Sequence, residues 1–301
     1  MLLKKTLLLF SVLLLACSLF FGLDKFVHKS SSLGNITTSY SSPEWEIPFE
    51  ELADPELLHR ILSQKFTYFN KGSQSYVYIS EDKQYILKFL KQDKLHPNTW
   101  LAYLPLSFNP HYKKSLFLKK KRISTFSAIK TAFSEFKKET GLLYVHLNRT
   151  KSLNKKITLF DRKGNLHVVD LDQTSFLVQK KANLIYVRIA ELMSESKIEE
   201  AKQIISSVFA LVDKLGKRGV VDNDPILRKN FGLIDDMAVQ IDIGRLRIDP
   251  ERIINLQHKQ EIASITHSFK TWITKNHPEL LEHFNACLEE TTQTTVLPSA
   301  S

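Results

Sequence analysis

The order of the predicted elements along the chain places the strongest limit on its fold. Apolar residues predict strands over 66–79 and 84–90, with a turn at 81–83. One long helix is predicted over 124–148, short strands follow it, and the remaining elements are mostly helices. Because strands and helices are segregated in this way, the sequence predicts an α+β fold with a sheet-rich first half and a helical second half.

The beginning of the chain contains an apolar run that is long enough to cross a bilayer. Residues 6–23 form an uncharged stretch of 18 residues preceded by Lys4 and Lys5. This pattern predicts an uncleaved, single-pass N-terminal anchor over 1–29, and therefore a membrane protein. A cleaved signal, which would make the protein secreted, and a lipidated Cys17 are the alternatives. The basic pair favours a cytoplasmic amino terminus, which would place the folded part on the outer side.

The length of 301 residues suits one two-lobed domain with appendages. After the anchor, a Ser/Thr-rich composition predicts a linker over 30–46. A sheet-rich lobe is expected over 47–182 and a reduced helical lobe over 183–290. Residues 291–301 are expected to be a disordered tail.

Composition limits the classes of partner and site. The formal charge of +10 favours anionic partners such as nucleotides, phosphate, acidic lipids or nucleic acid. A nucleic-acid partner is not expected, because no recognition-helix motif and no alternation of aromatic and basic residues is present. The run Lys119–Arg122 is interpreted as a solvated surface, with contact to lipid headgroups as the alternative. With only two cysteines, one of them in the apolar run, the chain cannot build a disulfide framework or a cysteine metal site.

Two candidate functional features lie in the first predicted hairpins. The turn over 70–77, with the sequence NKGSQSYV, contains Gly72, which lets a backbone approach phosphate oxygens closely. Lys88 follows within the apolar strand YILK, where an ammonium group needs an anionic partner or a path to solvent. Each feature alone is common in hairpins, so their significance rests on their order along the chain.

The third feature is the segment 222–230, DNDPILRKN, which precedes a predicted pair of strands ending in IDIG. The spacing of 12 residues between Asn230 and Asp242 fits a β-hairpin that brings both side chains to one cleft. Carboxylate and amide oxygens suit a hard cation such as Mg²⁺. The segment therefore predicts a metal site formed by Asn230 and Asp242.

In this order, the three features resemble those of the protein-kinase-like superfamily, over about residues 60–245. The turn resembles the glycine-rich loop, with Asn70 and Ser75 at the first and third glycine positions. YILK resembles the strand that carries the kinase lysine, and IDIG resembles the D-F-G motif. The resemblance implies a two-lobed fold and a phosphotransferase that uses ATP and Mg²⁺.

The resemblance also implies a role for each residue. Lys88 would pair with the α- and β-phosphates, and Asp242 and Asn230 would hold the metal ions. Asp224 would orient the acceptor hydroxyl, with Asp222 as the substitute candidate. Glu139, preferred to Glu135, would be the helix partner of the lysine. The full set of implied nucleotide-binding residues is Gly72, Ser73, Ser75, Val77, Lys88, Glu139 and Lys180, the last of these in a hinge over 179–182.

Departures from the kinase pattern leave a second interpretation open. The His and Arg of the catalytic loop are missing, and Asp224 lies six residues before Asn230, where the family has five. No activation segment follows Asp242. These features favour either a minimal kinase of the aminoglycoside or lipid type, or an inactive pseudokinase that serves as a membrane-tethered binding or scaffold module. The acceptor, and the choice between transfer of phosphate and of AMP, stay open.

Overall fold

The computed structural model describes residues 33, 35–38, 40–47, 54–97, 109–222, 225–251 and 257–292. The predicted anchor over 1–29 and the candidate Asp224 lie outside these residues, as does the predicted tail over 291–301 except for Thr291 and Thr292, which are helical rather than disordered. Within the described part of the chain, no helix is long and apolar enough to span a membrane.

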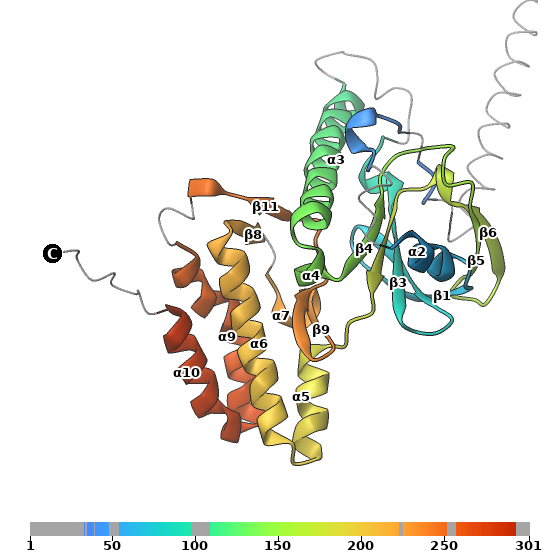
Figure 1. Ribbon diagram of the computed structural model, residues 1–301. Helices are drawn as coiled ribbons and strands as arrows, with labels where there is room; N and C mark the ends of the chain where they lie inside the picture. Colours follow the sequence, from blue (N-terminus) through green and yellow to red (C-terminus); the bar gives the residue numbers. More distant parts are fainter. Residues whose placement is uncertain are drawn as a thin grey trace, which may run out of the picture.

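The first lobe is built on a curled, seven-stranded sheet (Figure 1). Its strands are β1 (Phe66–Lys71), β2 (Ser75–Ser80), β3 (Tyr85–Leu90), β4 (Leu142–His146), β5 (Lys156–Phe160), β6 (Leu166–Asp170) and β7 (Phe176–Lys180). The strand order is β4-β7-β3-β2-β1-β5-β6, and only the β1–β5 pair is parallel. The helices of this lobe are α2 (Pro55–Leu62), α3 (Pro110–Glu135) and α4 (Lys137–Thr140).

The alternation of side chains along β3 separates a core face from a face that is open to a cleft. Leu87 and Phe89 are fully buried in the core of the sheet lobe. Ile86, Lys88 and Leu90 point to the opposite face, because successive strand residues alternate between the two sides of a sheet. The lysine of the predicted strand is therefore presented away from the core.

The long helix differs from its prediction at both ends. It begins at Pro110, where the Asn109 side chain accepts a hydrogen bond from the backbone N–H of His111 at 3.0 Å. The apolar period over this basic stretch is weak, so the sequence does not predict that the helix begins before residue 124. After α4, Gly141 adopts a left-handed conformation (φ 66°) and ends the helical segment. Residues predicted as the last helical turns form β4 instead.

The stretch predicted as a linker over 30–46 is partly packed against the sheet lobe. Ile36 and Trp45 are 2% and 7% exposed and belong to the core of that lobe. Thr37 pairs with Thr174 through an isolated β-bridge. Apolar side chains within a Ser/Thr-rich sequence, together with backbone hydrogen bonds such as Thr38 N–H to the Gln173 carbonyl at 2.8 Å, therefore hold this segment against the sheet lobe.

The second lobe is helical and contains two small, two-stranded antiparallel sheets (Figure 1). Its elements are α5 (Ile185–Ser194), α6 (Ile198–Lys217), β8 (Val220–Asp222), α7 (Leu227–Asn230), β9 (Phe231–Ile234), β10 (Met237–Gln240), β11 (Leu246–Ile248), α9 (Gln257–Asn276) and α10 (Leu281–Thr292). β9 pairs with β10, and β8 pairs with β11. The predicted α+β fold with a helical second half is confirmed, and it is compatible with a kinase-like fold.

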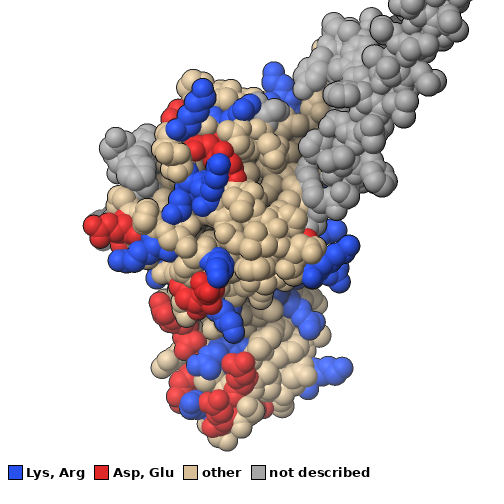
Figure 2. Space-filling model, turned by 90° about the vertical axis from the view of Figure 1, so that its right-hand side faces the viewer, with Lys and Arg blue, Asp and Glu red and all other residues tan. Residues whose placement is uncertain are grey.

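The core of the helical lobe is centred on aromatic side chains. Phe284 lies 5.0 Å from Phe209 and 5.7 Å from Phe269 between ring centroids, and all three rings are fully buried. Figure 2 shows one side of the molecule, on which charged side chains of both signs are intermixed over this lobe. The net positive charge is therefore not gathered into a single-sign surface on that face of the lobe.

Candidate functional site

A cavity of about 370 Å³ lies between the two lobes. The β1–β2 turn, β2, β3 and β7 contribute to it from the sheet side, and residues 241–244 contribute from the other side. Its apolar walls include Val77, Ile86, Leu177 and Leu184. A mainly apolar cavity with a few polar groups is typical of a small-molecule site.

The structure brings most of the predicted site residues to this cavity. Those that line it are Gly72, Ser73, Ser75, Val77, Lys88, Lys180 and Asp242. They lie on the β1–β2 turn, on three strands or at their ends, and in the segment after β10, which are far apart in sequence. The grouping of the β1–β2 turn, β3 and the segment after β10 is the arrangement that the sequence motifs predicted.

Lys88 has an unusual environment for a lysine. Its ammonium group donates a hydrogen bond to the backbone carbonyl of Ile241 at 2.6 Å. Desolvation lowers the pKa of Lys88 to about 8, and the nearby Asp242 carboxylate opposes this shift only in part. The folded protein thus holds an amine whose charge is poorly compensated by the surrounding protein groups.

Hydrogen bonds hold the β1–β2 turn in place at the cavity. The backbone N–H of Gly72 donates to the carbonyl of Ser75 at 3.0 Å, and the Lys91 side chain donates to the Gly72 carbonyl. On the opposite wall, a β-carbon placed on Gly244 would lie 2.8 Å from the side-chain oxygen of Gln74. The tip of the turn therefore reaches the segment that follows Asp242.

The charged groups at this cavity are mainly basic. Lys88, Lys180, Lys181 and Lys229 line it, against the single carboxylate of Asp242. Four ammonium groups around an apolar interior suit a ligand that has a flat apolar part and several negative charges.

Asn230 lies beside Asp242 but does not line the cavity. Its backbone carbonyl accepts hydrogen bonds from the N–H groups of Ile241 at 2.7 Å and Asp242 at 3.3 Å. The described residues contain no group of three or more His, Cys, Asp or Glu side chains that could hold a metal ion. The Asp242 carboxylate at this cavity fits a Mg²⁺ ion that keeps waters and ligand phosphates among its partners, which is common for this metal.

The expected Lys88–Glu139 pair is not present, and this expectation is corrected. Glu139 binds Lys214 of α6 at 2.5 Å. Burial would raise the pKa of Glu139, but the bond from Lys214 and a backbone hydrogen bond hold it below its usual value. The alternative, Glu135, binds Arg218 at 3.1 Å. Both carboxylates therefore face α6 rather than β3.

The side chain of α3 that reaches the cavity is Ile129. Ile129 and Phe133 are buried on one stripe of α3, and this stripe faces the sheet. Ile129 could not be recognised as a cavity residue from the sequence, because it is an ordinary member of the apolar period of this helix. Lys229 and Ile241, by contrast, lie within or beside the predicted motifs and could have been inferred from them.

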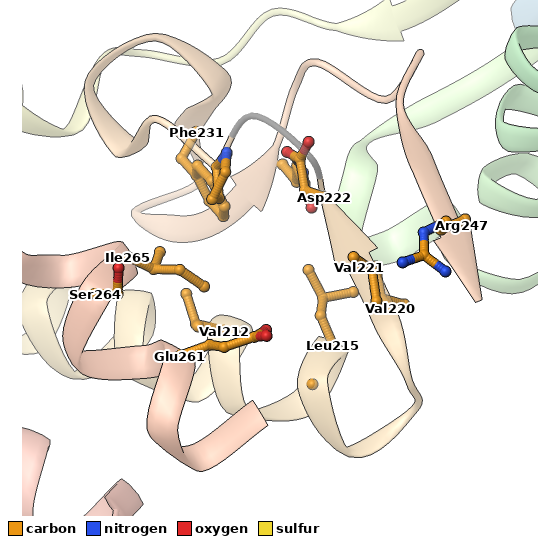
Figure 3. A pocket seen from close by; sticks show the side chains of 13 residues that line it. Val212, Leu215, Val220, Val221, Asp222, Phe231, Arg247, Glu261, Ser264 and Ile265 are labelled. Carbon is orange, nitrogen blue, oxygen red and sulfur yellow. Dashed lines mark hydrogen bonds between the residues drawn. The ribbon is translucent and has the colours of Figure 1, made fainter. Parts of the chain in front are cut away.

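Asp222 faces a different cavity, of about 310 Å³, which lies within the helical lobe (Figure 3). Its carboxylate accepts a hydrogen bond from the side-chain amide of Gln240 at 2.7 Å. Gln240 lines this second cavity, whereas Ile241 and Asp242 line the first. The structure therefore does not bring Asp222 into the cleft that holds Lys88.

Comparisons with known proteins find similarity only at the level of structure. No protein-family model matches the chain, and no curated protein matches it. Similar solved structures include the bifunctional kinase-methyltransferase WbdD, at 14% identity and a TM-score of 0.36, over 75% of this chain and 44% of that one. A higher-resolution WbdD crystal structure gives 14% identity and a TM-score of 0.37, over 74% of this chain and 45% of that one. The chain thus spans less than half the length of WbdD, and at these TM-scores the similarity carries no argument about its function.

Proposed function

We propose that the chain binds ATP–Mg²⁺ between its two lobes and acts as a phosphotransferase of the kinase-like type. The observation that carries this proposal is Lys88, a desolvated ammonium group that points into an apolar cleft next to Asp242. Placing a lysine there costs folding free energy, and an anionic ligand would recover it. The fixed order of the three sequence motifs supports the same assignment.

Each part of the cleft has a role in this proposal. The apolar walls around Val77 and Leu184 accommodate the base, and the backbone of the hinge at 179–182 reads its edge. Lys88 neutralises phosphate oxygens, and the turn at Gly72 covers them. Asp242 holds the Mg²⁺, which supplies further charge neutralisation when it is bound.

A second candidate function is a pseudokinase that binds a nucleotide without turnover and serves as a membrane-tethered scaffold. Two observations favour it. In the described part of the chain, Glu139 of α4 pairs with Lys214 rather than with Lys88, whose ammonium group binds a backbone carbonyl instead. Asp222, the substitute candidate for the catalytic aspartate, faces the second cavity rather than the cleft that holds Lys88. Turnover, rather than nucleotide binding, separates the two candidates.

The test is thermal unfolding of the full chain in detergent, with and without ATP–Mg²⁺. At a ligand concentration of 100 Kd, binding to the native state alone stabilises it by about 2.7 kcal/mol. We expect an Mg²⁺-dependent rise in Tm that Asp242→Ala abolishes and that the exposed control Glu279→Ala retains. No rise in the wild-type protein would refute nucleotide binding. A rise without release or transfer of the γ-phosphate would favour the pseudokinase.

Attachment to a membrane is also part of the proposal. It is supported by the apolar run over 6–23 and by α3, on which Leu116 and Phe117 are exposed among lysines. We expect the full chain to sediment with membranes and to be released by detergent but not by high salt. Release by salt alone would refute an inserted anchor.

A further inference from the structure

Apolar side chains lie on two faces of the long helix α3. One face, which includes Phe126 and Ile129, is buried in the core of the sheet lobe. Leu116, Phe117 and Ile123, by contrast, are 43%, 65% and 41% exposed. The outer face of a surface helix is normally polar, and apolar residues that gather there mark a contact surface.

The three exposed apolar residues share one side of α3 with two lysines. A helix brings residues that are three, four or seven positions apart onto the same side. The residues at this spacing, called here the outer stripe, are Lys113, Leu116, Phe117, Lys120 and Ile123. The outer stripe is therefore both apolar and basic, which suits a partner that is anionic at its surface and apolar beneath it.

The flanks of the outer stripe are basic as well. Residues 113–122 contain five lysines and one arginine, whereas Glu135, in the last turn, is the first acidic residue of α3. Four of these lysines are exposed and Lys121 is half-buried. Arg122 points inward, where its buried guanidinium group contacts the His96 ring at 3.1 Å. Ammonium groups around an exposed apolar strip are typical of a helix that lies on an anionic bilayer.

The helix α3 also packs against the part of the chain that follows the predicted anchor. Figure 1 shows the short helix η1 beside α3, and the Trp45 ring at its end lies 5.4 Å from the Phe126 ring between centroids. Only 12 residues separate the apolar run over 6–23 from Ile36, which is buried in the sheet lobe. A stretch of this length spans at most about 45 Å. An anchor over 6–23 would therefore keep α3 close to the bilayer.

We infer that the outer stripe of α3 lies on the surface of an anionic bilayer. Leu116, Phe117 and Ile123 enter the headgroup region, and the lysines around them pair with lipid phosphates. The inference rests on the membrane attachment proposed above, which brings α3 to the bilayer. A nucleic acid or an acidic protein surface would pair with the lysines but would leave the three apolar side chains in a polar environment.

The experiment places a tryptophan on the outer stripe and measures its contact with lipid. The full chain with Phe117→Trp is reconstituted into vesicles of brominated phosphatidylcholine, alone or mixed with brominated phosphatidylglycerol, and the wild-type chain gives the fluorescence background. We expect bromine to quench the introduced tryptophan at least about twofold more in the mixed vesicles, because the anionic lipid attracts the lysines. Val187→Trp, at a position of α5 in the helical lobe that is 52% exposed, is the matched control and should be quenched equally in both.

Charge variants test the electrostatic part of the contact. Lys113→Gln and Lys120→Gln, combined with Phe117→Trp, should remove most of the twofold difference, because each lysine near an anionic leaflet strengthens binding by about fivefold. The same change of charge on α9, by Lys270→Gln and Lys275→Gln, should retain it. Salt at about 1 M should act like the first pair of substitutions, because it shortens the screening length to about 3 Å.

Flotation of the same vesicles separates this inference from the attachment itself. A chain that floats with both vesicle types, but in which Phe117→Trp is quenched no more than Val187→Trp, overturns the inference and retains the anchor. Equal quenching of Phe117→Trp in the two vesicle types overturns the role of anionic lipid. Flotation with the mixed vesicles alone, with excess quenching at this position, refutes the inserted anchor and supports the inference. A chain that floats with neither refutes both.

Discussion

Two cavities in the described part of the chain meet at the end of one strand but are lined by different charged side chains. On one side of residues 240–242, four lysines and one aspartate surround an apolar cleft. On the other side, Asp222 and Glu261 face an apolar pocket, and Arg247 is engaged by Asp249. Residues close together in sequence therefore line different cavities. The Gln240 side chain donates to Asp222 in the cavity of the helical lobe, whereas the Asp242 carboxylate lies in the cleft between the lobes. The comparison teaches that the end of one strand contributes to two cavities with different charged side chains, which are called here the basic cavity (Lys88 and Asp242) and the acidic cavity (Asp222 and Glu261).

The largest effect is expected from Lys88→Met, which tests the basic cavity. The pKa of Lys88 is lowered from 10.5 to about 8 in the folded state, so the protonated lysine destabilises the ligand-free protein at pH 7. Methionine removes this cost, and the free energy of unfolding should rise by up to about 3 kcal/mol. The variant should also lose stabilisation by ATP–Mg²⁺. Urea denaturation with and without nucleotide measures both effects.

The same variant predicts a pH dependence. Between pH 8 and 10.5 the unfolded wild-type chain binds more protons at Lys88 than the folded protein does, so the wild type gains stability as pH rises. The advantage of Lys88→Met should therefore be complete below pH 8 and vanish near pH 10.5. A variant that is less stable at pH 7 would show that the bond to Ile241 outweighs desolvation.

A smaller effect is expected from Gln240→Glu, which adds a third carboxylate to the acidic cavity. The new carboxylate would be buried beside Asp222, where it loses the donated hydrogen bond and meets a like charge. We expect a loss of about 2 kcal/mol at pH 7, in the range for a buried unpaired polar group. Repulsion raises the folded-state pKa, so this loss should shrink as the pH falls toward 4. A loss that does not depend on pH would argue against a charged cavity.

The sequence predicted the basic cavity far better than the acidic one, for a physical reason. Gly72, Lys88 and Asp242 each lie in a local motif whose residue types follow from contact with phosphate or metal. Glu261 and Ile265 are one turn apart on a helix, and nothing local distinguishes them from a solvated residue and a core residue. Only the packing of α9 against α6 turns them into a cavity wall.

The errors at helix ends have a related cause. The pattern of apolar residues continues from α3 into β4, so the sequence predicts a single helix over 124–148, with Glu139 as the expected partner of Lys88. The left-handed Gly141 and the break at Phe136 rotate that carboxylate toward α6 instead. The order of elements is thus encoded locally, whereas the direction of a side chain after a break depends on tertiary packing.

Gly232→Ala should weaken ligand binding in the basic cavity. It should also lower the free energy of unfolding by about 1–2 kcal/mol, as expected for an overpacked position. A β-carbon at Gly232 would lie 2.7 Å from that of Ala182 and 2.9 Å from the carbonyl oxygen of Asn183, which would push the hinge away. We expect a smaller rise in Tm with ATP–Mg²⁺ than in the wild type. Met237→Ala is the control, because Met237 lies on the same β9–β10 pair, is 62% exposed and lines neither cavity. Equal effects of the two variants would argue against a role of the hinge.

The smallest effect is expected from Lys214→Met, which tests whether Glu139 belongs to the basic cavity after all. Lys214 is largely exposed, so loss of its ion pair should cost less than about 1 kcal/mol. The variant removes the ion pair between Glu139 and α6. If the Glu139 carboxylate could then reach Lys88, it would form the lysine–glutamate pair that kinases use, and the affinity for ATP–Mg²⁺ should rise. Because α4 holds Glu139 beside α6, we expect the affinity for ATP–Mg²⁺, measured by calorimetry, to stay within about twofold of the wild type. A fivefold gain, lost again in Lys214→Met combined with Glu139→Gln, would return Glu139 to the site.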